Sequence, residues 1–261
     1  MRILVVGDLH GKFPKNLPKR DVDLILLTGD LGKADLARRM AFENIERKRQ
    51  GLKEKNFSHH QKKVAYMQAY NSSLKVLRFL SRFASVYFIS GNVEYPYEDM
   101  RKLSNQIGEK LPTLAGAVRG MENVRVINNQ IANFKSLRIG GLEYFVDVSW
   151  VREFKPSDYK EKMRDAKKQS DKAREILRRF QDVDILLCHQ PPHGILDKVS
   201  FASAPKLWKG KHAGSKIILD YVQRKHPRYV FCGHIHEAEG MRRIGKTEVY
   251  NLGLGYKVIE I

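Results

Sequence analysis

Short apolar runs alternate with longer amphipathic stretches along the whole chain. The apolar runs are rich in Val, Ile and Leu, and most of them end at Gly, Asp, His or Asn. This pattern is typical of buried strands in an α/β or layered α+β domain. It predicts strands at 2–6, 23–27, 86–90, 124–127, 137–141, 184–188, 229–232, 247–250 and 256–260.

Two long stretches, at about 33–82 and 150–181, have helical periodicity instead. In the first, Ser58 and Gln61 match a capping box, and in the second an Asp158…Glu161 cap signal precedes the apolar positions. The apolar stripes consist of Val64, Met67, Tyr70, Leu74 and Leu77, and of Tyr159, Met163, Ala166, Ser170, Ala173, Leu177 and Phe180. We expect both stripes to pack on the protein's own body. The pattern therefore predicts a single domain over 1–261 with two helical insertions.

Composition narrows the class of protein. A chain of 261 residues that is 42% hydrophobic can bury a sizeable core, which excludes global disorder. It has no run of about 18 apolar residues and no signal-peptide pattern after Met1, so we expect a soluble protein with no membrane contact. Cys188 and Cys232 each end an apolar run, which excludes a disulfide framework and a cysteine zinc finger and fits a reducing cytoplasm.

The chain is strongly basic, with 48 Lys and Arg against 29 Asp and Glu, a formal net charge of +19. Residues 31–63 hold ten basic and four acidic side chains, and residues 150–180 hold eleven and six. This excess favours an anionic partner, and RNA or DNA held by the two insertions is one candidate. A nucleotide or other small phosphate ester is the alternative, because charge on an amphipathic helix is often only its solvated face and no aromatic residues interleave it.

Five polar elements follow predicted strands, where α/β folds keep their chemistry. They are Asp8-x-His10, Gly29-Asp30, Gly91-Asn92 with Glu94, His189, and Gly233-His234-x-His236. One such element alone is most often a turn or a cap, but five in succession indicate a common site. Their four imidazoles, two carboxylates and one carboxamide exceed what a single tetrahedral ion can use. The set fits two divalent ions that share one bridging carboxylate.

These elements resemble the pattern D-x-H, G-D, G-N-H-[DE], H and G-H-x-H of the calcineurin-like metallophosphoesterase superfamily, over nearly the whole chain. The stretches HQPPHGILDKV, KHAGS and CGHIHEAEG are most similar to the Icc-related predicted phosphoesterases. The resemblance implies a four-layer αββα sandwich of two mixed sheets. It also implies which residues bind metal: Asp8, His10 and His236 at one ion, Asn92, His189 and His234 at the other, and Asp30 between them.

The resemblance further implies a hydrolase in which the two ions activate water and bind the phosphate, with Asp30 and Asn92 at the reacting centre. Manganese is favoured by this analogy, while iron, zinc or nickel suits the same ligand types. Val93 stands where the family pattern has a His that acts as general acid. His193, next to Gly194, and His212, two residues before Gly214, could replace it, although either could equally be an ordinary loop histidine.

We therefore expect a dinuclear-metal phosphodiesterase that acts on nucleotides or nucleic-acid ends and prefers activated leaving groups. Two alternatives belong to other classes: a metal-retaining but weakly active or inactive scaffold that binds protein partners, and a nucleic-acid-binding protein in which metals only hold the fold. The complete ligand set disfavours both. The sequence carries no signature of an oligomeric state and no base-reading motif.

Overall fold

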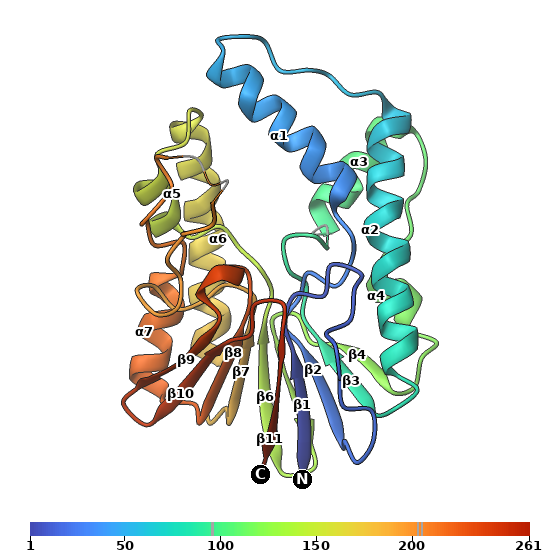
Figure 1. Cartoon of the computed structure of the whole chain (residues 1–261), viewed down its shortest axis with the longest axis vertical. Helices are drawn as coiled ribbons and strands as arrows, with labels where there is room; N and C mark the ends of the chain where they lie inside the picture. Colours follow the sequence, from blue (N-terminus) through green and yellow to red (C-terminus); the bar gives the residue numbers. More distant parts are fainter. Residues whose placement is uncertain (95–96, 203, 205) are drawn as a thin grey trace.

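The computed structural model describes residues 1–94, 97–202, 204 and 206–261. Two mixed sheets pack face to face at its centre, with helices on both outer sides (Figure 1). The first has the order β11-β1-β2-β3-β4, from β1 (Arg2–Val6), β2 (Leu24–Leu27), β3 (Ser85–Phe88), β4 (Val124–Val126) and β11 (Tyr256–Glu260). The second has the order β5-β6-β7-β8-β10-β9, from β5 (Gln130–Phe134), β6 (Leu137–Leu142), β7 (Ile185–Cys188), β8 (Tyr229–Cys232), β9 (Gly240–Ile244) and β10 (Thr247–Asn251).

Helices lie on the outer sides of the two sheets (Figure 1). On the side of the first sheet lie α1 (Asp35–Arg49), α2 (His59–Leu80), α3 (Tyr97–Ile107) and α4 (Leu114–Val118). On the side of the second lie α5 (Val148–Phe154), α6 (Tyr159–Arg179) and α7 (Lys216–Lys225), and a short 3-10 helix, η1 (His236–Ala238), follows β8. No described helix combines the length and apolar character that a bilayer span requires.

Apolar side chains on both faces of the central strands explain the layers. In β2, Leu24 and Leu26 pack between the sheets against residues such as Leu187, whereas Ile25 and Leu27 pack outward against Leu77 of α2. On the other side, a third apolar cluster joins the second sheet to α6 and α7. Strands buried on both faces read as continuous apolar runs, as these do. The predicted arrangement of two mixed sheets between helices is confirmed.

All nine predicted strands form, but β5 and β9 were missed. Both are edge strands with exposed positions, so neither contains the apolar run of a buried strand. The stretch 33–82 is divided into α1 and α2 by a connection at 50–58, and 150–181 is divided into α5 and α6. The helices α3, α4 and α7 also had no counterpart in the prediction.

The local signals within the two helical stretches had different outcomes. The capping box is confirmed, since the Gln61 amide donates to Ser58 Oγ and the Ser58 amide donates to Gln61 Oε1. Asp158 does precede α6, but its side chain makes no capping hydrogen bond, so that part of the prediction was wrong. Val64 and Tyr159 are exposed because the apolar stripes turn away from the core at the starts of α2 and α6.

Candidate metal centre

The carboxyl ends of parallel strands bring the five polar elements to one end of both sheets. Asp8 and His10 follow β1, Asp30 follows β2, and Asn92 follows β3. His189 follows β7, while His234 and His236 follow β8. The strands β1, β2 and β3 are mutually parallel, as are β7 and β8, so the loops after them meet.

Asp8, His10 and His236 form one group of donors, with ligand atoms within 4.8 Å of one another. Asp8 Oδ2 lies 3.0 Å from His236 Nε2, and His10 Nε2 lies 3.4 Å from the same nitrogen. Burial and the Arg38 charge lower the pKa of His10 to about 4, so this imidazole is neutral at pH 7. A carboxylate oxygen and an imidazole lone pair therefore converge where a cation would bind well.

Asn92, His189 and His234 form a second group. Asn92 Oδ1 lies 2.9 Å from both His189 Nε2 and His234 Nδ1. His189 Nδ1 donates to the carbonyl of Thr28 at 2.9 Å, which leaves Nε2 facing the amide oxygen. Burial lowers the pKa of His234 to about 3, so this ring is neutral as well. Two imidazole nitrogens and one amide oxygen thus face one another.

Asp30 lies between the two groups and directs one carboxylate oxygen to each. Its Oδ2 is 3.8 Å from His10 Nε2, and its Oδ1 is 3.6 Å from His189 Nε2. Burial raises the pKa of Asp30 to about 7, and the nearby carboxylates of Asp8 and Glu94 act in the same direction against the charge of His189. Asp30 also forms a further group with Asp8 and His189, whose ligand atoms lie within 4.8 Å of one another. Carboxylate oxygens and imidazole nitrogens are donors that divalent cations accept.

The backbone of this site is strained. His10, Asp30 and His234 have φ values of 43°, 48° and 69°, in the left-handed region that side chains other than glycine rarely adopt. Close approach also explains two glycines of the motifs. A Cβ at Gly91 would lie 2.3 Å from Asp30 Oδ1, and one at Gly233 would lie 2.1 Å from Asp8 Oδ1. The glycines let neighbouring loops approach the carboxylates.

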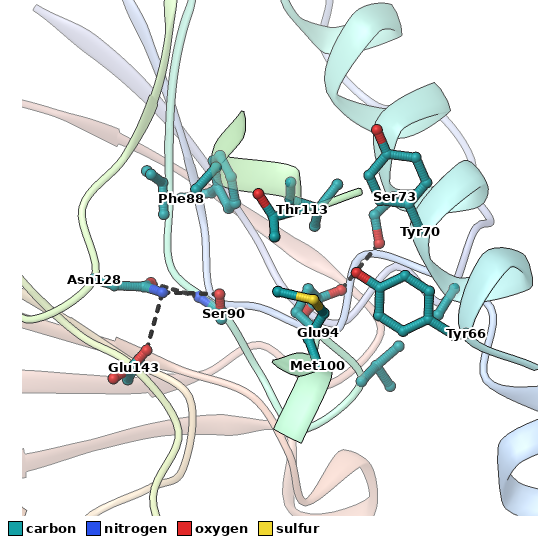
Figure 2. A pocket seen from close by; sticks show the side chains of 15 residues that line it. Tyr66, Tyr70, Ser73, Phe88, Ser90, Glu94, Met100, Thr113, Asn128 and Glu143 are labelled. Atoms are coloured by element: carbon teal, nitrogen blue, oxygen red, sulfur yellow. Dashed lines mark hydrogen bonds between the residues drawn. The ribbon is translucent and has the colours of Figure 1, made fainter. Parts of the chain in front are cut away.

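Glu94 connects two loops of the site, and the sequence analysis proposed no role for it. Its buried carboxylate accepts hydrogen bonds from the backbone amides of Asp30, Leu31, Gly32 and Gly91 and from Ser73 Oγ. Figure 2 shows the contact with Ser73 of α2. Glu94 thereby joins the loop after β2 to the loop after β3. The sequence signal for this role was the acidic position at the end of the G-N-H-[DE] pattern, which Glu94 occupies.

Two further residues that the sequence analysis missed support the second group. Thr28 accepts the His189 hydrogen bond through its carbonyl, which no side-chain pattern reveals. Tyr144 has its ring 5.6 Å from that of His189 and 5.5 Å from that of His234, centroid to centroid. Burial and the charge of Asp30 raise the pKa of Tyr144 to about 12, so it is a neutral wall of the site.

His193 and His212 lie together in a different loop region. Their ring centroids are 5.3 Å apart, and His212 Nδ1 lies 2.7 Å from Oδ1 of the buried Asp197. Within the described residues, neither histidine makes a hydrogen bond or ion pair with the seven predicted ligands. The loop of His193 is nevertheless linked to the loop of His234 and His236. Asn251 Nδ2 donates to the carbonyl of Leu196 in the first loop and to that of Ile235 in the second.

A family model and one solved structure agree with this architecture. The family model described as "Calcineurin-like phosphoesterase" matches residues 1–238. One crystal structure superposes with a TM-score of 0.63 at 15% identity, covering 99% of this chain and 94% of that chain. Another, the "Putative 5'-Nucleotidase from Staphylococcus aureus in complex with alpha-ketoglutarate", has a TM-score of 0.44 at 15% identity, covering 99% of this chain and 50% of that chain.

No curated protein matches the sequence. The match of the family model spans all the strand ends described above, from Asp8 to His236. It identifies the superfamily that the motifs resemble and does not distinguish the Icc-related group within it. The chain belongs to the calcineurin-like phosphoesterase family, a family of phosphoester hydrolases.

Proposed function

We propose that this chain is a dinuclear-metal phosphodiesterase that acts on nucleotides or nucleic-acid ends. The convergence of two donor groups on the two oxygens of Asp30 carries the proposal. Asp8, His10 and His236 would hold one ion, and Asn92, His189 and His234 would hold the other. Asp30 would be shared by both. Two bound divalent ions supply Lewis acidity at phosphorus and make water a better nucleophile at neutral pH.

The chain's own contacts hold these donors in position. The His234 amide donates to Asp8 Oδ2 at 2.6 Å, and the Val93 amide donates to Asp30 Oδ1 at 2.8 Å. Each carboxylate is thereby oriented by a backbone group from a different loop, and the Thr28 carbonyl selects the tautomer of His189. Such supporting hydrogen bonds fix ligand orientation and basicity.

We propose His212 as the general acid in place of Val93, which is buried and has no proton to donate. Asp197 accepts from His212 Nδ1, so the remaining ring nitrogen, Nε2, is free to hold and transfer a proton. His193 is the second candidate, and burial lowers its pKa. The packing of their loop beside Ile235, between two predicted ligands, supports both assignments.

The substrate proposal extends from the metal centre to α6. A cavity of about 740 Å³ is lined by Asn92 and Tyr144 at the centre and by Lys162, Lys168 and Lys172 of α6. Cationic side chains along such a groove would neutralise successive phosphates of an RNA or DNA strand. Nucleic acid is therefore preferred to a small phosphate ester as the natural substrate.

Manganese is the preferred metal, with iron, zinc and nickel as alternatives, because nitrogen and oxygen donors accept all four. We also place the protein in the cytoplasm. Cys188 and Cys232 are both buried and free, as expected in a reducing compartment.

The direct test combines metal analysis of the purified protein with hydrolysis of bis(4-nitrophenyl) phosphate and 4-nitrophenyl phosphate. We expect about two equivalents of metal and faster turnover of the diester. His212→Gln should slow the hydrolysis of alkyl diesters more than that of aryl diesters, because an aryl oxide leaves without protonation. A wild-type protein that binds metal but hydrolyses neither ester would contradict the proposal.

Titration with single-stranded RNA and DNA at several salt concentrations tests the substrate class. Lys168→Glu should weaken binding and reduce its salt dependence. Lys246→Glu is the matched control, because it makes the same charge change at an exposed turn before β10, at the opposite end of the sheet from the metal centre. Equal binding by both variants would favour a small phosphate ester.

A further inference from the structure

Arg38 of α1 reaches the first donor group of the metal centre. Its Nη2 lies 3.0 Å from His10 Nε2. Arginine has donors only, so the imidazole nitrogen must accept this hydrogen bond with its lone pair. The same nitrogen faces His236 Nε2 at 3.4 Å and Asp30 Oδ2 at 3.8 Å. The guanidinium therefore lies at the edge of the predicted metal site.

Arg38 differs from the basic residues near the other end of α1. Arg47 donates to the Lys53 carbonyl, Lys48 pairs with Glu54, and Arg49 pairs with Glu46. In the part of the chain that the structure describes, the Arg38 guanidinium has no carboxylate partner and no hydrogen bond except the one to His10. Its positive charge also contributes to lowering the pKa of His10 and of His234, after burial and other charges.

The fold fixes the start of α1 beside the centre although α1 has no buried residue. The Lys33 amide donates to Ser72 Oγ at 2.7 Å, and the Leu36 amide donates to Gln68 Oε1 at 3.1 Å, both on α2. Figure 1 shows α1 extending from α2 towards α5 and α6, beyond the ends of the strands. This position suits a helix whose side chains act at the metal centre rather than in the core.

We propose that Arg38 is a substrate-binding residue whose guanidinium binds non-bridging oxygens of the phosphate. The inference rests on the proposed function, because a metal ion at His10 would use the lone pair that now accepts from Arg38. The guanidinium would then be a cation at the centre without an acceptor of its own. The planar fork of arginine matches two phosphate oxygens, so an anionic phosphate is the ligand class that fits it best.

The test compares Arg38→Ala with Arg39→Ala in the manganese-loaded protein. Arg39 is the matched control, because it is the next residue of α1, is exposed, and loses the same charge. Inorganic phosphate binding is measured by titration calorimetry, and KM and kcat are measured with bis(4-nitrophenyl) phosphate. We expect Arg38→Ala to weaken phosphate binding and raise KM by about tenfold or more, since hydrogen bonds to charged groups are the stronger ones. Arg39→Ala should match the wild type.

Two additional measurements separate this role from others. Bound manganese should be the same in Arg38→Ala and wild type, and Arg38→Lys should recover part of the phosphate affinity through its charge. Phosphate binding that is equal in Arg38→Ala and Arg39→Ala, in an active wild-type enzyme, would overturn this inference alone. Loss of metal from Arg38→Ala would also overturn it, by showing that Arg38 supports the ions. An inactive metal-loaded wild type would instead contradict the proposed function.

Discussion

Replacing Glu94 with Gln would test how the two loops of the metal centre are held together. The substitution keeps the shape of the side chain but turns one acceptor oxygen into a donor. At present Oε2 accepts from the amides of Asp30, at 2.8 Å, and Gly91, at 3.0 Å. Oε1 accepts from Leu31, at 2.9 Å, from Gly32, at 3.2 Å, and from Ser73 Oγ. In either orientation of the new amide, its NH₂ group faces at least two backbone N–H donors.

The expected loss of stability follows from these contacts. A hydrogen bond to a charged group contributes about 1.5–3 kcal/mol, so two lost bonds cost roughly 3–6 kcal/mol. Part of this is offset, because the Glu94 charge is one of those that raise the pKa of Asp30 and its removal relieves that repulsion. We expect Glu94→Gln to lower the free energy of unfolding by about 2–5 kcal/mol. Ser73→Ala, which removes one neutral donor, should cost about 1 kcal/mol.

Urea unfolding of the metal-free protein, followed by circular dichroism, measures this effect. Glu109→Gln is the control, because it makes the same chemical change at an exposed carboxylate that pairs with Lys63. Exposed pairs of this kind contribute about 0–1 kcal/mol. If Glu94→Gln and Glu109→Gln unfolded at the same urea concentration, the assignment of Glu94 as the link between the loops would be refuted.

The remaining predictions concern the metal centre itself. Asp30→Ala should reduce bound metal and turnover more than His10→Ala, because its carboxylate faces both donor groups; metal analysis that finds two ions in Asp30→Ala would exclude a shared ligand. Burial raises the pKa of Asp30 from 3.8 to about 7, so the folded metal-free protein keeps a proton that the unfolded chain releases. The stability contributed by Asp30 should therefore fall as pH rises through that window, and urea titrations with chelator present should show a flatter profile for Asp30→Asn. Finally, Val93→His in the His212→Gln variant should restore kcat for alkyl diesters selectively, and an equal gain for aryl diesters would argue against a general acid at this position.

The central strands and the approximate position of the centre could be predicted from the chain alone. Runs such as Leu24–Leu27 and Ile185–Cys188 are apolar throughout because both of their faces are buried. The residues that follow parallel strands lie at one edge of a sheet, so Asp8 and Asp30 were expected to be neighbours, and the family resemblance added His189. The capping box at Ser58 could also be predicted from the sequence, because its partner Gln61 lies three residues away.

Other features depend on contacts that sequence patterns do not encode. The edge strands β5 and β9 owe their form to pairing with β6 and β10, since their own residues alternate too weakly to predict strands. The approach of His10 to His236 joins residues 226 positions apart, and the contact of Arg38 with His10 depends on how α2 holds α1.

The division between the two kinds of information follows from the range of the forces involved. Burial and backbone hydrogen bonding act on each segment, so they leave a periodic record in the sequence that predicts the strands. The seven candidate donors follow from the motifs at the strand ends and from the family resemblance. Which donor faces which, the tautomer of His189, and the loop junction at Glu94 are set by tertiary packing. Only the folded chain brings Asp30 between two groups of imidazoles, where burial and neighbouring carboxylates set its pKa.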